Sequence, residues 1–156
     1  HELACHSYSH PYFSMFSARA AEREITGAHK IIQHVVQEAG VGVSRQNRFF
    51  RFPYGDAGSY LNYDTSQEVL ADLGYQIAWW DLDTQDWRME LSPYARKPAA
   101  VIASLSRARA RDVVLLHDRT RTAQVLPSLL DILHSKGMAS LPLSEYPVSH
   151  PDKSIE

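Results

Sequence analysis

The sequence has little cysteine, little net charge and no long apolar run. Its single cysteine, Cys5, excludes an internal disulfide but leaves the compartment open, because many exported bacterial domains lack disulfides. No apolar run is long enough to span a membrane, and no signal peptide is visible. The net charge of −2 gives no reason to expect a nucleic acid partner. A local arginine cluster is better explained as a solvated face; it comprises Arg107, Arg109, Arg111, Arg119 and Arg121.

The bulk composition is that of one globular domain. The chain has 156 residues, of which 44% are hydrophobic and 22% are charged. We expect the domain to occupy residues 1–148 and residues 149–156 to form a polar, loose tail.

Strand-like and helix-like segments alternate along the chain. An apolar stripe predicts a helix over residues 18–39 that Gly40 ends; it comprises Ile25, Ala28, Ile32, Val35 and Ala39. A capping box at residues 65–68 predicts a second helix, Ser92-Pro93 a third, and the leucine-rich stretch before Gly137 a fourth. The predicted strands cover residues 1–6, 49–52, 75–82, 113–116 and 139–143. This alternation favours an α/β fold of parallel strands with helices packed outside them.

A polar motif follows each of the first four predicted strands. The motifs read His6-Ser7-Tyr8-Ser9-His10, Arg51-Phe52-Pro53-Tyr54-Gly55, Asp83-Thr84-Gln85-Asp86-Trp87 and Leu115-Leu116-His117-Asp118. In barrels of parallel strands the chemistry sits at the C-terminal ends of the strands. The sequence therefore predicts an active site at that rim.

His6 and His10 are four residues apart, about one helical turn, so both imidazoles can point to one side and share a metal ion. A zinc site normally needs at least three protein ligands, and Asp83, Asp86 and His117 are candidates for the third. Capping or a salt bridge is the alternative role for the two aspartates. His117 is either a hydrogen-bonded core histidine or a general acid or base.

Other side chains have weaker alternatives. Arg51 could pair with a carboxylate, and the backbone N–H of Tyr54 could face an oxyanion because Pro53 fixes the turn. Aromatic rings offer surfaces on which sugars stack, although packing explains most of them: Tyr8, Tyr12, Tyr60, Tyr63, Trp79, Trp80 and Trp87. The remaining histidines, which we predict at the surface, are His29, His34, His134 and His150.

With the four motifs assembled, the chain resembles the polysaccharide deacetylase family, also called the NodB-homology domain or carbohydrate esterase family 4. The resemblance runs from His1 to about Leu143. It implies an irregular (β/α)7 barrel, of which this chain would cover about five of the seven strands.

The resemblance also implies roles for single residues. His6 and His10 would be ligands of Zn²⁺, or of another divalent metal such as Co²⁺ or Mn²⁺. Arg51 would be the partner of the catalytic-base aspartate, and the N–H of Tyr54 an oxyanion donor.

Under the resemblance, the two later motifs supply the general acid and the residues around it. His117 would be the general acid, tuned by a carboxylate for which we favour Asp86 over Asp83. Trp87 and Leu115 would be walls of the acetyl pocket.

The chain departs from the family at one motif. The family's Thr-Phe-Asp-Asp segment, which supplies the general base and the third zinc ligand, is absent, and no Asp-Asp pair occurs in the sequence. Removing adjacent strands from a barrel exposes sheet edges and apolar faces. We therefore expect an N-terminal segment or a second chain to carry the Asp-Asp motif and to complete the domain.

The implied function is that of a metal-dependent deacetylase. It would hydrolyse acetyl groups from an N-acetylglucosamine-containing polysaccharide or oligosaccharide, of the chitin or peptidoglycan type. The location would be secreted, periplasmic or in the cell envelope. Two alternatives remain open: a non-catalytic carbohydrate-binding or scaffold remnant of the family, and an acetylxylan esterase.

Overall fold

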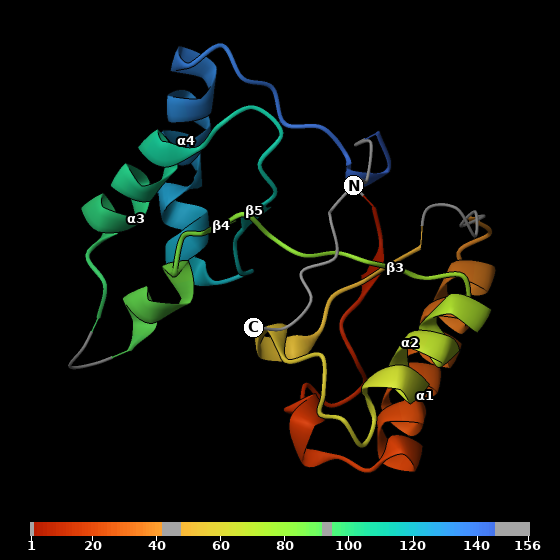
Figure 1. Cartoon of the computed structure of the whole chain (residues 1–156). Helices are drawn as coiled ribbons and strands as arrows, with labels where there is room; N and C mark the ends of the chain where they lie inside the picture. Colours follow the sequence, from red (N-terminus) through yellow and green to blue (C-terminus); the bar gives the residue numbers. More distant parts are fainter. Residues whose placement is uncertain (1, 42–47, 92–94, 146–156) are drawn as a thin grey trace. The chain divides into compact units, whose positions relative to one another are not determined.

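The computed structural model describes residues 2–41, 48–91 and 95–145, and Figure 1 shows the course of the chain. The chain divides into two compact units, a first unit of His1–Trp79 and a second unit of Trp80–Glu156. The predicted tail over residues 149–156 lies outside the described residues. The extent of a single domain over residues 1–148 stays a prediction.

The first unit contains a three-stranded parallel sheet. Strands β1 (Ala4–Cys5), β2 (Phe49–Phe50) and β3 (Gln76–Ile77) lie in the order β1-β2-β3. Cys5 pairs with Phe50, and Phe50 pairs with Ile77. Helix α1 (Ala18–Glu38) connects the first two strands, and α2 (Tyr63–Asp72) connects the second and third. Parallel strands joined by helices confirm the predicted α/β class.

Helix α1 confirms the helix predicted over residues 18–39. The Ser17 side chain accepts a hydrogen bond from the N–H of Ala20 and caps the first turn. Gly40, with φ +65°, ends the helix in the left-handed conformation that glycine adopts without cost. Two positions of the predicted stripe are wrong: Val35 is 52% exposed while its neighbour Val36 is buried, and Ala39 is exposed.

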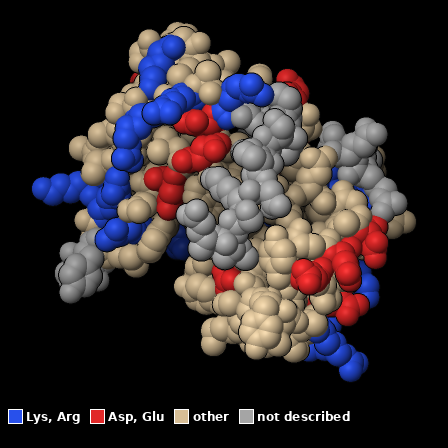
Figure 2. All heavy atoms as spheres, in the orientation of Figure 1, with Lys and Arg blue, Asp and Glu red and all other residues tan. Residues whose placement is uncertain are grey.

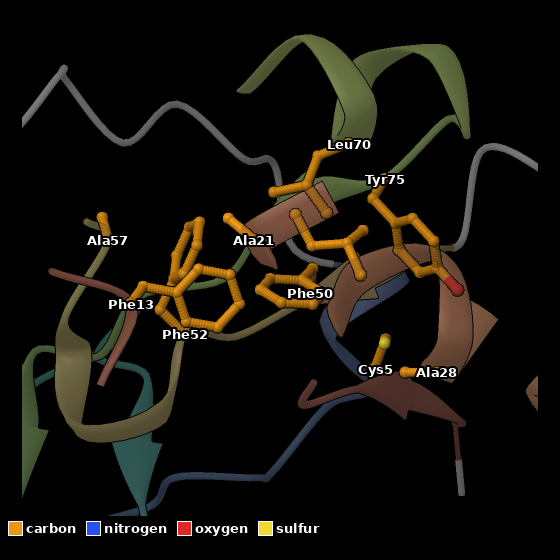
Figure 3. Close-up of a cluster of buried hydrophobic side chains, with 10 residues drawn as sticks. Cys5, Phe13, Ala21, Ala28, Phe50, Phe52, Ala57, Leu70 and Tyr75 are labelled. Atoms are coloured by element: carbon orange, nitrogen blue, oxygen red, sulfur yellow. The ribbon is translucent and has the colours of Figure 1, made fainter. Parts of the chain in front are cut away.

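Aromatic rings fill the core between this sheet and its helices. The Phe52 ring meets Phe13 edge-on at 5.0 Å between centroids and Phe50 at 4.9 Å. Figure 3 shows these three rings side by side, with Leu70 and Tyr75 beyond Phe50. Ile25 of α1 and Leu70 of α2 pack against the same cluster. This core supports β1 and β2, the two strands that the first two motifs follow.

The second unit is built around a separate strand pair. Strand β4 (Leu82–Asp83) lies parallel to β5 (Val114–Leu115). Helices α3 (Pro98–Ser104) and α4 (Thr120–Ser135) cover an apolar core, which comprises Met89, Val101, Leu105, Ala108, Val125 and Leu129.

The structure corrects two predicted strands. Residues 75–82 form two short strands, because Ala78 donates to Phe50 whereas Leu82 donates to Val113, so the segment changes partner midway. Residues 139–143 form no strand, and Pro142 lacks an N–H for a ladder. That stretch instead lines an apolar hollow of about 670 Å³ together with β5 and α4.

Two helix starts also differ from the prediction. Helix α2 begins at Tyr63, so the predicted capping box lies inside the helix. Asn62 precedes it, and its side chain bonds elsewhere. Helix α3 begins at Pro98, not at Ser92-Pro93, which fall outside the described residues. Proline at the first helical position has no N–H to lose and so favours this start.

His29 is not a plain surface residue. Its Nδ1 lies 3.1 Å from the Tyr75 hydroxyl, and its side chain is half-buried. Burial, with the nearby charge of Arg48, lowers the pKa of His29. Burial raises the pKa of Tyr75 to about 12. The predicted exposure holds for His34 and His134, whereas His150 lies outside the described residues.

Charged side chains lie on the surface of both units. The five clustered arginines are all exposed, and Figure 2 shows Lys and Arg side chains beside Asp and Glu over the second unit. Arg119 pairs with Glu90 at 3.5 Å, and Arg121 donates to the carbonyl of Met89. Among the described residues, no helix is long and apolar enough to cross a membrane.

Replacing Asn62 by alanine should destabilise the protein. The side chain is buried; its Nδ2 donates to the carbonyls of Phe13 at 2.6 Å and Phe16 at 2.9 Å, and its Oδ1 accepts from Ser59 at 2.8 Å. Leaving these groups unpaired should lower the free energy of unfolding by about 2–3 kcal/mol in urea titrations. Glu68→Ala, an exposed change on α2, is the control and should stay within about 0.5 kcal/mol of the parent. An equal effect of both substitutions would contradict the assignment.

Candidate active site

The loop after β1 brings two imidazoles together. The His6 and His10 rings lie 4.9 Å apart between centroids and meet edge to face at 76°. Their approach does not come from a helical turn, because residues 6–10 form a loop. Ser7 and His10 have φ of +67° and +59°, and the N–H of His10 donates to the Ser7 hydroxyl at 3.0 Å. The predicted proximity is therefore found, although its predicted cause is wrong.

The backbone of the second motif orients His6. The His6 Nδ1 lies 2.6 Å from the carbonyl oxygen of Arg51, which can only accept a hydrogen bond, so Nδ1 carries the proton. In the neutral ring this leaves the lone pair on Nε2. Metal-binding histidines commonly use this arrangement, in which the second nitrogen donates to a carbonyl.

Arg51 follows β2 and joins it to the loop. Its N–H donates to the carbonyl of Cys5 at 2.9 Å, and its Nη2 lies 3.5 Å from His6 Nε2. Burial lowers the pKa of Arg51. Among the described residues, none of the ion pairs joins Arg51 to a carboxylate. Its expected role as partner of a catalytic base stays a prediction.

Tyr54 lies in a strained turn beside the imidazoles. It has φ +59° within the short 3₁₀ turn Pro53–Gly55. Its ring stacks on Tyr12 at 4.0 Å with 10° between planes and lies 4.8 Å from the His10 ring. Both tyrosines are at least half exposed, at 50% for Tyr12 and 56% for Tyr54. The first unit thus presents an aromatic pair next to its imidazole pair.

In the second unit, a buried carboxylate holds His117. The Asp86 side chain has no exposed surface. Its Oδ1 lies 2.8 Å from His117 Nδ1, and its Oδ2 accepts from the backbone N–H of His117 at 2.8 Å. Because a carboxylate only accepts, His117 Nδ1 carries a proton and Nε2 is the nitrogen turned away from the pair. This pairing fixes both the position and the tautomer of the ring.

Two threonines complete the shell of Asp86. Thr122 donates to Oδ2 at 2.6 Å, and Thr84 lies 3.2 Å from Oδ1 while also donating to the carbonyl of Leu115 at 3.0 Å. Burial alone would raise the pKa of Asp86, but the hydrogen bonds from Thr122 and His117 together lower it. Asp86 is therefore an ionised acceptor at neutral pH.

Asp83 has a different local role. Its Oδ1 accepts from the N–H of Gln85 at 2.8 Å and closes the turn in which Gln85 has φ +53°. Trp87 is 39% exposed, and Leu115 is buried at 8%. Asp86, not Asp83, thus contacts His117, and the functional role of either carboxylate stays a prediction.

The donor set fits a divalent metal in part. Two neutral imidazoles in contact, one oriented by a carbonyl, suit a metal of the Zn²⁺ type. Within the described ranges, no group of three or more His, Cys, Asp or Glu side chains could hold a metal ion. His6 and His10 as metal ligands therefore stay a prediction.

Several residues that shape the site were missed by sequence reasoning. Thr122 lies on the same face of α4 as the buried Val125 and Leu129, and a polar residue in such a stripe is a usable signal for a buried partner. Two further residues have no comparable signal, because their contacts join segments far apart in sequence. Thr84 donates to the carbonyl of Leu115, and Glu24 of α1 accepts from the N–H of Ser9.

The chain matches known proteins along most of its length. The sequence model of the polysaccharide deacetylase family matches residues 1–78, half of the chain. The chain is 29% identical over 161 residues to a chitooligosaccharide deacetylase of Sinorhizobium fredii, with 91% of this chain and 66% of that protein covered. It is 27% identical over 139 residues to a bifunctional xylanase/xylan deacetylase of Cellvibrio japonicus, with 88% and 18% covered.

A solved structure is similar as well. The family 4 carbohydrate esterase from Streptomyces lividans, in complex with acetate, aligns with a TM-score of 0.69 and 28% identity, covering 89% of this chain and 64% of that one. The likeness confirms the expected NodB-type (β/α)7 barrel as fold class. The chain spans less than two thirds of the length of each of these three proteins.

Asp86→Asn should flatten the dependence of stability on acid pH. Because the folded protein lowers the pKa of Asp86, ionised Asp86 contributes stability that is fully present above the ordinary carboxyl pKa of about 3.9. That contribution is lost as the pH falls through the lowered folded value. Urea unfolding at several pH values between about 2 and 5 measures the slope. Asp118→Asn, at the exposed neighbour of His117, is the matched control; equal slopes in parent and Asp86→Asn would refute the prediction.

Proposed function

Because the chain belongs to the polysaccharide deacetylase family, we propose that it is part of a metal-dependent carbohydrate deacetylase. The substrate is an acetylated polysaccharide or oligosaccharide that contains N-acetylglucosamine, of the chitin or peptidoglycan type. The observation that carries the proposal is the Asp86–His117 pair, because a histidine with one nitrogen fixed by a buried carboxylate is suited to proton transfer at the other. The activity named for the Sinorhizobium fredii protein supports a chitin-type substrate, whereas that named for the Cellvibrio japonicus protein favours the acetylxylan alternative.

His117 acts as the general acid in this proposal. Its Nδ1–H is held by Asp86, so Nε2 is the atom that delivers a proton to the leaving nitrogen or oxygen. Ionised Asp86 stabilises the imidazolium from which that proton comes. Hydrolysis breaks the bond between the acetyl carbonyl and the sugar substituent and gives acetate and the deacetylated sugar.

His6 and His10 are the metal ligands that this chain supplies. A bound divalent metal, Zn²⁺ or another such as Co²⁺ or Mn²⁺, supplies Lewis-acid polarisation of the acetyl carbonyl and of water. Arg51 keeps the His6 ring oriented through its carbonyl, and its guanidinium orients the base. The Tyr54 N–H is a donor to the developing oxyanion. Trp87 and Leu115 are walls of the acetyl pocket.

The third ligand and the general base come from an Asp-Asp segment outside these 156 residues. This part of the proposal is supported by the absence of any Asp-Asp pair in the sequence and by the absence of a third ligand beside the imidazoles among the described residues. The segment belongs to the same polypeptide or to a second chain. An acetylated cell-wall or chitin-type substrate favours a secreted, periplasmic or cell-envelope location.

A non-catalytic carbohydrate-binding domain is the second candidate. The incomplete donor set of the described residues favours it, because a two-imidazole pair alone is a weak metal site. The exposed Tyr12–Tyr54 stack would then be the surface that binds a glycan. Glycan binding without acetate release by the full-length gene product would support this candidate against the deacetylase.

Acetate release tests the reaction and the role of His117. The full-length gene product should release acetate from N-acetylated chito-oligosaccharides; faster release from acetylated xylan would identify an acetylxylan esterase instead. His117→Ala should lower the rate about 10²–10⁴-fold, the usual worth of a general acid, and should leave the bound metal unchanged. His134→Ala, an exposed histidine on α4, is the matched control. A rate near that of the parent in His117→Ala would remove His117 from the mechanism.

Metal content tests the imidazole pair. His6→Ala should abolish the bound divalent metal of the full-length gene product, measured by elemental analysis after dialysis, because it removes one of few ligands. His34→Ala is the control, because His34 is exposed and its Nε2 lies beside the Glu38 carboxylate on the same helix. Unchanged metal stoichiometry in His6→Ala would overturn the ligand assignment.

A further inference from the structure

Glu24 of α1 binds the loop that separates the two imidazoles. Its Oε2 accepts from the backbone N–H of Tyr8 at 3.1 Å and of Ser9 at 2.8 Å. Its Oε1 accepts from the Ser9 hydroxyl at 2.7 Å. Both carboxylate oxygens are therefore used by the two residues midway between His6 and His10. Charge-assisted bonds of this kind are stronger than neutral ones.

The loop depends on such a contact because no ladder supports it. Strand β1 ends at Cys5, and residues 6–10 make no strand pairing. Hydrogen bonds fix both ends of the loop. At one end His6 Nδ1 donates to the carbonyl of Arg51, and at the other the N–H of His10 donates to the Ser7 hydroxyl. Glu24 fixes the middle of the loop, where the N–H groups of Tyr8 and Ser9 would otherwise face solvent. The residues on either side, Ser7 and His10, have left-handed backbone conformations.

The helix makes Glu24 a rigid anchor. Ala21, Ile25 and Ala28 of α1 are buried in the core, so the backbone that carries Glu24 is held by packing. Glu24, three residues after Ala21 and four before Ala28, lies at the edge of that stripe and reaches the loop with its side chain. The position of the loop is thereby tied to the core of the first unit.

We propose that Glu24 is a positioning residue for the metal pair: it holds Tyr8 and Ser9 so that His6 and His10 stay together before a divalent metal arrives. The inference rests on the proposed function, since it takes these imidazoles as ligands. Glu24 is not itself a ligand, because both of its oxygens are engaged by the loop. A preorganised pair binds metal more tightly because less loop entropy is lost on binding.

Three variants of the full-length gene product separate this role from general stability. Glu24→Ala removes all three hydrogen bonds. Glu24→Gln keeps them, because its amide oxygen accepts from the two N–H groups and its NH₂ donates to the Ser9 hydroxyl. Glu22→Ala is the control on the same helix, where the Glu22 side chain is exposed and its backbone carbonyl accepts from the Thr26 hydroxyl.

The readouts are the affinity for Zn²⁺ or Co²⁺ by calorimetry and the amide exchange of Tyr8 and Ser9 without metal. Glu24→Ala should weaken metal binding about 10–100-fold and speed exchange at both amides, whereas Glu24→Gln and Glu22→Ala should behave like the parent. Unchanged affinity in Glu24→Ala would overturn this inference alone. An equal loss in Glu24→Gln would also overturn it, because charge and not loop geometry would then be the cause. Absence of metal binding by the parent would overturn the metal pair of the proposed function, and this inference with it.

Discussion

The hydrogen bond from a loop N–H to a carboxylate is the interaction on which both units depend. The strands are two residues long, so ladders satisfy few backbone groups and the loops need other acceptors. In the part of the chain that the structure describes, aspartate and glutamate side chains supply such acceptors: Glu24, Asp56, Asp81, Asp83, Asp86 and Asp112. Two of these carboxylates also hold candidate functional segments: Asp86 binds His117, and Glu24 binds the loop between His6 and His10. Local folding and candidate chemistry thus use one kind of contact.

Much of the fold could be predicted because its signals are local. The apolar stripe and Gly40 define α1 to within a residue, and four predicted strands overlap the observed ones. The errors arise where contacts with residues distant in sequence determine the local structure. The segment over residues 75–82 changes partner from Phe50 to Val113, which no pattern within it reveals. The helix predicted from the capping box at residues 65–68 begins earlier, at Tyr63, after Asn62, whose side chain bonds to carbonyls of residues 13 and 16.

The membership of the candidate site stays a prediction, whereas two of its side-chain contacts are described by the structure. Motifs at strand ends led to His6 and His10 in the first unit and to Asp86 and His117 in the second, and each pair is in contact within its own unit. The choice of Asp86 over Asp83 came from resemblance, whereas the contact itself depends on how β4 and β5 align. The supporting residues Thr84, Thr122 and Glu24 could not be identified, because a single threonine or glutamate has no motif until the chain is folded.

The single cysteine can report local opening of the first unit. Cys5 is buried beneath α1 at 1% exposure, and burial raises the pKa of its thiol, so native protein presents almost no reactive thiolate to an alkylating reagent. Because the second unit contains no cysteine, labelling follows opening of the first unit alone. The rate at which Cys5 is labelled therefore measures how often the first unit, which carries His6, opens. Comparing this rate with the unfolding rate of the whole chain shows whether the first unit opens on its own, and no introduced probe is needed.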